Sequence, residues 1–196
     1  MNNSLGAVFK RAVGRGVYPH QMAWALELGV RNVLLSPKKH LKRLPLRSHF
    51  HAVEIGCGSG FYSVAVAHTL SYGALSLIDI QEEMLAKARS KMDKAHVENV
   101  RYIAADAAKL PFGDETVDMI YLVTVFGELH DQQAFLREAK RVLKMGGFLS
   151  ITEHQPDPDF MPMDSVEPLV VREGFTVLEM YGWQWNYTLN FKKISA

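Results

Sequence analysis

The sequence predicts a doubly wound α/β fold with a mostly parallel seven-stranded sheet that ends in an antiparallel hairpin. Strand-like and helix-like segments alternate between residues 52 and 152, which places helices on both faces of a parallel sheet. The last two strand-like segments are joined by only four residues, and so short a connection permits only antiparallel pairing. The 196 residues, 48% of them hydrophobic, are enough for one domain with a sizeable core.

The first three strands follow one another with helices between them. Each expected strand is a short apolar run, and each expected helix has apolar residues at spacings of three and four. Strands are expected over residues 52–55, 74–80 and 100–104, and helices over 61–70 and 82–95.

The second half continues this alternation and then departs from it. Gly146 and Gly147 are expected to end a helix before the fifth strand, and a Pro- and Asp-rich loop follows that strand. The remaining strands are expected over residues 119–125, 148–152, 176–181 and 186–192, and the remaining helix over 132–143.

A basic segment, residues 1–50, precedes the first strand. It holds nine Lys or Arg and one acid, whereas residues 51–196 hold 13 bases and 20 acids. A helix is expected over 21–35, and Ser36 with Pro37 is typical of the start of a second, basic helix. We interpret residues 1–50 as a helical lid and residues 51–196 as the core domain. The basic charge would steer an anionic partner, or it is only a solvated face.

Composition restricts the kinds of site and location that are expected. Cys57 is the single cysteine, so an internal disulfide and a Cys-rich metal cluster are excluded, and no metal site is expected. The sequence has no run of 18 apolar residues and does not start with the apolar stretch of a secretory signal. The sequence therefore predicts a cytoplasmic protein without a membrane span.

A glycine-rich turn after the first strand is the strongest functional signal. Gly56, Gly58 and Gly60 allow the backbone to turn tightly and to approach a ligand that a Cβ would exclude. Nineteen residues after Gly60, Asp79 ends the second strand, where this fold class places a carboxylate against the two hydroxyls of a ribose. Together they predict a ligand that contains a nucleoside.

Two further residues indicate which nucleoside it is. Dinucleotide folds carry a glycine three positions after the middle glycine, where this chain has Phe61. Glu54, two residues before Gly56, would repel a pyrophosphate but can help to hold an ammonium or sulfonium group. A cationic ligand is therefore favoured.

The segment Val53-Glu54-Ile55-Gly56-Cys57-Gly58-Ser59-Gly60 resembles the first motif of the class I S-adenosylmethionine-dependent methyltransferases. Residues 105–112, 118–123 and 141–147 resemble later motifs of that family. The resemblance covers residues 51–196, is closest to the small-molecule, quinone and lipid-type enzymes, and implies S-adenosylmethionine as cofactor. It implies a cofactor site made by Glu54, Gly56, Cys57, Gly58, Gly60, Asp79, Ile80, Asp106, Ala107 and Val123.

Departures from the family's patterns bear on the methyl acceptor. Residues 124–128 read Thr-Val-Phe-Gly-Glu in place of the Asn-Pro-Pro-Tyr pattern of enzymes that methylate nucleic acids, so a nucleic-acid acceptor is not expected. Glu128-Leu129 stands where the quinone-type enzymes usually carry Arg-Asn. The expected function is methyl transfer to a small molecule or lipid, with an anionic acceptor favoured if the basic segment takes part. The oligomeric state is left open.

Candidate catalytic residues lie after the fourth and fifth strands. A sulfonium already provides a good leaving group, so catalysis needs mainly alignment and removal of an acceptor proton. His130 is the first choice as base because an imidazole titrates near neutral pH; the alternative is that it caps the following helix. The other candidates are Glu128 and His154, with Asp131 and Glu153 beside them.

An acceptor pocket is expected from aromatic and Met side chains in the loop after the fifth strand and in the final hairpin, although ordinary packing is an equal alternative. These residues are Phe160, Met161, Met163, Trp183 and Trp185.

Two other functions stay open. A nicotinamide-dependent oxidoreductase would share the glycine turn and Asp79 but is opposed by Phe61 and Glu54. A non-catalytic scaffold or partner subunit would keep the nucleoside site without turnover.

Overall fold

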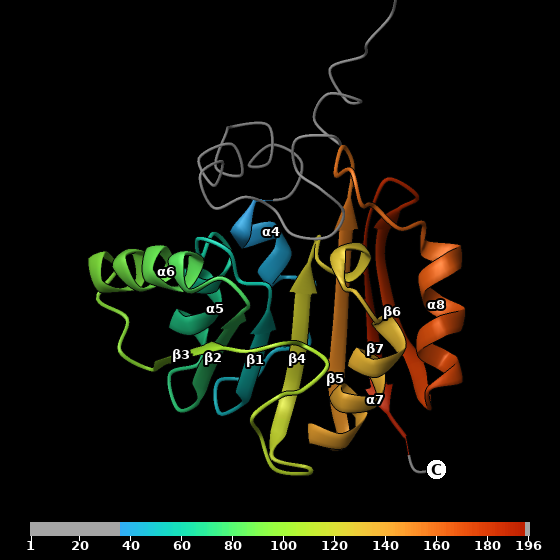
Figure 1. Cartoon of the computed structure of the whole chain (residues 1–196), viewed down its shortest axis with the longest axis horizontal. Coiled ribbons are helices and arrows are strands. Elements are labelled where there is room, and N and C mark those ends of the chain that lie inside the picture. The colour runs from blue at the N-terminus through green and yellow to red at the C-terminus, as the bar shows by residue number, and fades with distance from the viewer. Residues whose placement is uncertain (1–35, 195–196) are drawn as a thin grey trace, which may run out of the picture.

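The computed structural model describes residues 36–194, which form a seven-stranded sheet flanked by helices (Figure 1). The strand order is β3-β2-β1-β4-β5-β7-β6. The first five strands are parallel, and β7 pairs antiparallel with both β5 and β6. The predicted doubly wound fold with an antiparallel C-terminal hairpin is confirmed.

The strands overlap the predicted segments, although β5 is longer than predicted. They are β1 (His51–Ile55), β2 (Ala74–Asp79), β3 (Val100–Ala104), β4 (Val117–Val123), β5 (Leu143–His154), β6 (Phe175–Trp183) and β7 (Asn186–Lys193). The helices are α4 (Pro37–Leu41), α5 (Ser63–Thr69), α6 (Glu82–Lys94), α7 (Gln132–Val142), α8 (Met163–Arg172) and the 3-10 helix η2 (Phe126–Glu128).

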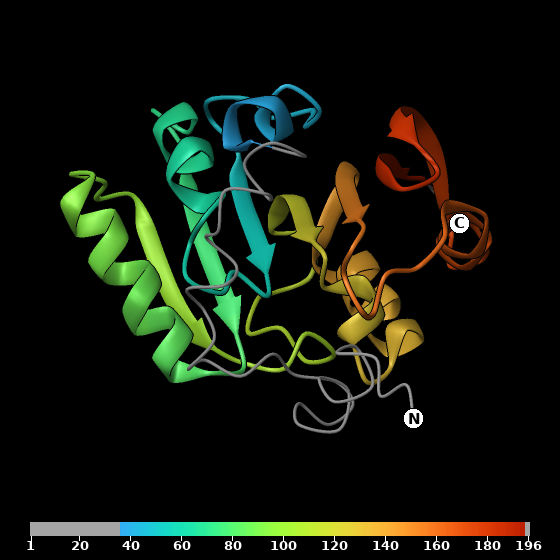
Figure 2. The same ribbon diagram turned by 90° about the horizontal axis from the view of Figure 1, so that it is seen from above.

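Alternate residues of the central strands enter two different hydrophobic clusters, one on each face of the sheet. On β4, Ile120 and Leu122 join a cluster that includes residues of α7 and α8, whereas Met119 and Tyr121 join a cluster that includes residues of α5 and α6. This period of two is what a strand covered on both faces requires. Figure 2 shows α5 and α7 on opposite sides of the sheet.

The end of the basic segment that the structure describes belongs to the packed fold. Ser36 caps α4 by accepting a hydrogen bond from the Lys39 N–H, with Pro37 in the first turn as predicted. Leu44 and Phe50 are buried in the cluster on the α5 face. The predicted helix over 21–35 lies outside the described residues.

The expectation that Gly146 and Gly147 end a helix before the fifth strand was wrong. The helix expected over 132–143 ends at Val142, and β5 begins directly at Leu143, so Gly146 and Gly147 lie inside a strand. Gly146 has φ +74, and the ladder with β4 shifts register between Val117 and Met119, so this part of the strand is irregular.

The helix α8 was not expected, because the segment was taken for a loop. It contains Pro168, which ordinarily argues against a helix interior. Val166 and Val170 of α8 are fully buried against the sheet, so tertiary packing outweighs the cost of the proline.

Candidate functional site

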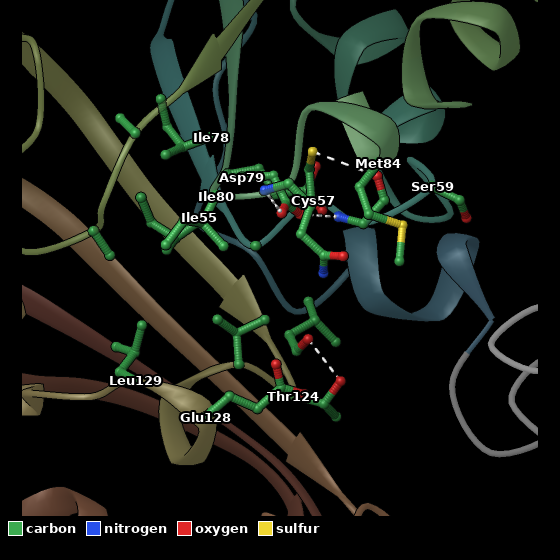
Figure 3. Close-up of a pocket in the computed structure, with 18 of the residues that line it drawn as sticks. Ile55, Cys57, Ser59, Ile78, Asp79, Ile80, Met84, Thr124, Glu128 and Leu129 are labelled. Carbon is green, nitrogen blue, oxygen red and sulfur yellow. Dashed lines mark hydrogen bonds between the residues drawn. The ribbon is translucent and has the colours of Figure 1, made fainter. Parts of the chain in front are cut away.

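A cavity of about 210 Å³ opens at the carboxyl ends of β1, β2 and β4. Ligands of open α/β sheets bind at this edge, where the strand order reverses. Figure 3 shows Asp79, Cys57 and Ile80 on one side of the cavity and Thr124, Glu128 and Leu129 on the other. Its lining comprises Glu54 to Ser59, Phe61, Tyr62, Ile78 to Gln81, Met84, Ala105 to Ala107, Val123 to Val125, Glu128 to His130, and Asp157.

The three glycines of the turn after β1 differ in what surrounds the position where a Cβ would lie. Gly58 has φ +51 and lines the cavity, and within the described residues a Cβ added there would meet no atom within 4 Å apart from its chain neighbours. A Cβ on Gly56, at φ +64, would lie 2.5 Å from a methyl of Val125. Gly60, at φ +76, approaches Ala88 of α6 and does not line the cavity. Only Gly58 is therefore open toward a ligand.

Asp79 at the end of β2 joins the two loops that border the cavity. Its carboxylate accepts hydrogen bonds of 2.9 Å from the N–H groups of Gly58 and Gln81. Burial raises the pKa of Asp79, while these N–H groups oppose the rise by stabilising the carboxylate. Because a carboxylate has about four acceptor positions, it can still accept hydrogen bonds from a ligand.

Glu54 holds negative charge at the back of the cavity. It is 3% exposed, and its Oε2 accepts hydrogen bonds from the Ser63 and Tyr121 hydroxyls. Burial and the charge of Glu54 raise the pKa of Tyr121 well above its usual value, so this phenol stays a donor. The charge of Glu54 favours a cation nearby.

The loop after β3 provides a polar edge beside an apolar surface. Asp106 is exposed, and its Oδ1 accepts a hydrogen bond of 2.9 Å from the Ala108 N–H. Ala107 is 8% exposed and packs in the cluster on the α7 face. A carboxylate next to a backbone amide at this position can pair with a heterocycle that presents both a donor and an acceptor.

At the end of β4 the backbone turns sharply into η2. Thr124 has φ +54, and its N–H donates to the Thr152 carbonyl at 2.8 Å. This conformation is rare for a β-branched residue, and such outliers concentrate at functional sites. The turn directs Glu128 and His130 toward the cavity, which both residues line.

His130 does not cap α7. That role belongs to Asp131, whose Oδ1 accepts a hydrogen bond of 2.8 Å from the Ala134 N–H. His130 is exposed and lines the cavity, which leaves the catalytic interpretation of this residue open and removes the capping alternative.

The candidates on β5 point to opposite faces of the sheet. Glu153 shares a face with Leu149 and Ile151, which lie in the cluster on the α7 and α8 face, and His154 has the other orientation. His154 is 5% exposed and does not line the cavity. Glu153 is 1% exposed, and burial, followed by the charge of Asp157, raises its pKa to about 8.

The residues expected to form an acceptor pocket do not line this cavity. Phe160 and Met161 pack against the core, and the Met161 carbonyl accepts a hydrogen bond of 2.6 Å from the Tyr187 hydroxyl. Trp183 and Trp185 of the final hairpin are exposed. Within the described residues these side chains therefore fit the packing alternative or lie on the surface.

The cavity gathers every residue predicted for the cofactor except Gly60, together with Glu128 and His130. Sequence reasoning missed Thr124, Leu129 and Asp157, which also line it. Nothing in the local sequence marks Asp157 as a lining residue, because it reaches the cavity from a loop about 30 residues beyond β4.

None of the described helices has the length and apolar character needed to cross a membrane.

Comparison with known proteins identifies related sequences. Residues 53–151 match the family described as methyltransferase domain. The chain is 32% identical over 162 residues to a demethylmenaquinone methyltransferase of Staphylococcus aureus (strain MRSA252), covering 79% of this chain and 66% of that protein. The chain thus spans about two thirds of the length of the curated relatives it matches.

Solved structures show the same architecture. A SAM dependent methyltransferase from Aquifex aeolicus superposes with a TM-score of 0.83 at 26% identity, covering 91% of this chain and 100% of that one. An S-adenosylmethionine dependent methyltransferase from Mesorhizobium loti has a TM-score of 0.65 at 16% identity, covering 80% and 98%. The latter likeness concerns the fold alone.

Proposed function

Because the chain belongs to the methyltransferase domain family, with S-adenosylmethionine as its cofactor, we propose that it transfers a methyl group to a small-molecule or lipid acceptor. The observation that carries the proposal is that Gly58 and Asp79 lie in one cavity, 2.9 Å apart from N to Oδ2, with Gly58 open toward a ligand. A nucleoside can approach the backbone there and meet a carboxylate in the same place.

The lining residues fit the cofactor by their chemistry. Asp79 would accept hydrogen bonds from the ribose hydroxyls, and Asp106 with the Ala107 N–H would pair with the adenine edge. Glu54 would favour the cationic methionine end through its charge. When bound, the cofactor supplies a methyl group on a sulfonium, whose departure leaves a neutral thioether.

The residues of this chain contribute alignment, exclusion of water and acceptance of a proton. Leu129 and Val125 provide apolar lining against which an acceptor would be held, away from water. His130 is proposed to take the acceptor proton, because it lines the cavity and caps no helix.

The acceptor class is proposed more narrowly from the lining and the relatives. The curated relatives are named demethylmenaquinone methyltransferases, which favours a hydroxylated aromatic ring of the quinol type as one candidate. None of the described residues lining the cavity is Lys or Arg, while Glu54, Asp79, Asp106, Glu128 and Asp157 are acidic. A neutral acceptor therefore suits this cavity better than an anionic one.

The proposal is tested by titrating S-adenosylmethionine into the protein in a calorimeter, with Gly58→Ala as the diagnostic variant. Its methyl group would enter open space beside the cavity without meeting any other described residue, so we expect at least about tenfold weaker binding. Gly146→Ala is the matched control, since Gly146 also has positive φ, +74, and lies away from the cavity. Both variants should lose about 1–2 kcal/mol of stability from the backbone strain alone.

Acceptor turnover is measured as S-adenosylhomocysteine release across quinols, phenols, amines, carboxylates and phospholipids. Absence of cofactor binding by the wild-type protein, or equal binding by both glycine variants, would overturn the proposed site. Binding of a nicotinamide dinucleotide in its place would support the oxidoreductase alternative. Cofactor binding without release on any acceptor would favour a scaffold.

Two expectations stay predictions. The basic lid is proposed for residues 1–50, of which residues 36–50 pack on the core and the rest lies outside the described residues. A cytoplasmic location is likewise proposed and rests on the sequence pattern alone.

A further inference from the structure

Two hydroxyl groups lie behind Glu54 and donate to the same oxygen of its carboxylate. The Tyr121 hydroxyl donates to Oε2 at 2.8 Å, and the Ser63 hydroxyl donates to Oε2 as well. Glu54 lines the cavity, whereas Tyr121 and Ser63 do not. We propose that Tyr121 and Ser63 are positioning residues, which hold the Glu54 carboxylate where it binds the ammonium group at the methionine end of the cofactor. This inference rests on the proposed function and deepens it.

The register of the sheet brings Tyr121 to Glu54. Glu54 on β1 is the direct partner of Tyr121 on the neighbouring strand β4, so both side chains project from the same face. Ser63 is the first residue of α5, and residues of α5 pack in the same cluster as Tyr121 on this face. A strand and a helix therefore each supply one hydroxyl to a single carboxylate.

Burial makes these two hydrogen bonds important for Glu54. Ser63 and Tyr121 are both 0% exposed, and Glu54 is 3% exposed. A buried carboxylate is costly unless hydrogen bonds satisfy it, and donors to a carboxylate stabilise its charged form. Because both donors are fixed in the core, they also restrict the direction in which the carboxylate points.

The ligand group that suits such a carboxylate is a cation. S-adenosylmethionine and S-adenosylhomocysteine both carry an ammonium group at the methionine end, whereas methylthioadenosine has the same nucleoside without that end. A hydrogen bond from an ammonium to a carboxylate is charge-assisted and therefore strong. Asp79 and Asp106 also line the cavity, but they are proposed to bind the ribose and the adenine edge. Glu54 is thus the acid assigned to the ammonium group.

The diagnostic variant is Tyr121→Phe, which keeps the buried ring and removes only the hydroxyl. S-adenosylhomocysteine and methylthioadenosine are titrated separately into the full chain in a calorimeter. Affinity for S-adenosylhomocysteine should fall by about tenfold or more, because a less firmly held carboxylate binds the ammonium less well. Affinity for methylthioadenosine should stay at the wild-type value. Ser63→Ala should change the two affinities in the same direction.

Tyr187→Phe is the matched control. Tyr187 is likewise 0% exposed, but it packs in the cluster on the α7 and α8 face, and its hydroxyl donates to the Met161 carbonyl. This variant loses a tyrosine hydroxyl from the core without touching Glu54, so it should bind both ligands like the wild type.

A double-mutant cycle tests whether Tyr121 acts through Glu54. Glu54→Gln removes the negative charge and should itself weaken S-adenosylhomocysteine binding. Adding Tyr121→Phe to Glu54→Gln should change the affinity little further, since the two residues act as one unit.

The outcomes separate this inference from the proposed function. Absence of S-adenosylhomocysteine binding by the wild type would overturn both. Normal binding by the wild type would leave the proposed function standing, and three results would then overturn the positioning role alone. These are undiminished binding by Tyr121→Phe, an equal loss for both ligands, and additive losses in the double-mutant cycle.

Discussion

Thr124 shows how single residues set the geometry of the site. A β-branched residue at φ +54 is held there by its N–H bond to the Thr152 carbonyl, and the turn it makes presents Glu128 and His130 to the cavity. Gly58 and Asp79 set the backbone geometry on the proposed cofactor side, where a hydrogen bond of 2.9 Å links them. Each half of the cavity thus depends on one unusual backbone position at a strand end.

At this scale we predict the effect of His130→Gln. Gln keeps a polar side chain of similar reach but cannot accept a proton as an imidazole does, so turnover should fall by about 100-fold or more. Cofactor affinity should stay at the wild-type value, because His130 is proposed to face the acceptor. The measurements are S-adenosylhomocysteine release on the best acceptor of the screen and calorimetric cofactor binding, with the exposed His68→Gln as control. Undiminished turnover would remove His130 from the mechanism.

Among the elements, η2 and the loop before α8 border the proposed acceptor side of the cavity. The sequence pattern does not predict η2 or the conformation of this loop, because neither is a regular element. The helix α8 that follows contains Pro168. They are positioned by long-range contacts, such as that between Gly127 and the Asp159 carbonyl and the hydrogen bond from Tyr187 to the Met161 carbonyl. The acceptor side therefore depends on elements packing against one another.

For these elements we predict that Gly127→Ala is destabilising. The added methyl overlaps the Asp159 carbonyl, a backbone atom that cannot rotate away, so the free energy of unfolding should fall by about 1–3 kcal/mol. In Gly113→Ala the nearest atom is a Thr116 methyl at 3.3 Å, which can move, and the loss should be much smaller. Urea unfolding of both variants provides the comparison. Equal losses would mean that the contact between η2 and the loop is loose.

In the molecule as a whole, one buried histidine between the sheet and α4 makes stability depend on pH. His40 is 1% exposed between the rings of Tyr62 and Tyr121, at centroid distances of 4.9 and 6.0 Å. Neither of its ring nitrogens has a hydrogen-bond partner in the described part of the chain. Burial, then the charges of Arg43 and His154, lowers the pKa of His40 from 6.5 to about 3.

The whole-molecule prediction is a loss of stability in mild acid. Between pH 6.5 and about 3 the unfolded chain binds a proton at His40 that the folded chain does not, so stability falls as the pH falls through this window. At pH 5 the loss from this residue should be about 2 kcal/mol relative to pH 7. His40→Phe should remove that part of the pH dependence in urea unfolding, whereas His68→Gln, at an exposed position, should keep the wild-type slope. Parallel pH profiles for wild type and His40→Phe would refute this assignment.

The sequence by itself determined the order and type of most elements and which residues would meet at the proposed cofactor side of the cavity. Alternating apolar runs and helical spacing depend on neighbours within a few residues, and the glycine turn, Asp79 and the Asp106-Ala107 pair each follow a predicted strand directly. Parallel strands bring their carboxyl ends to one edge, so residues at those ends were certain to meet.

Only the tertiary structure decided which residues border the proposed acceptor side. Asp157 and Asp159 come beside Glu128 from about 30 residues away, His154 and Glu153 take opposite faces of the sheet, and Trp183 and Trp185 of the final hairpin remain on the surface. These outcomes depend on which face a strand residue takes and on how a loop packs back onto a 3-10 turn. Both are set by contacts between distant segments, which no local pattern in the sequence records.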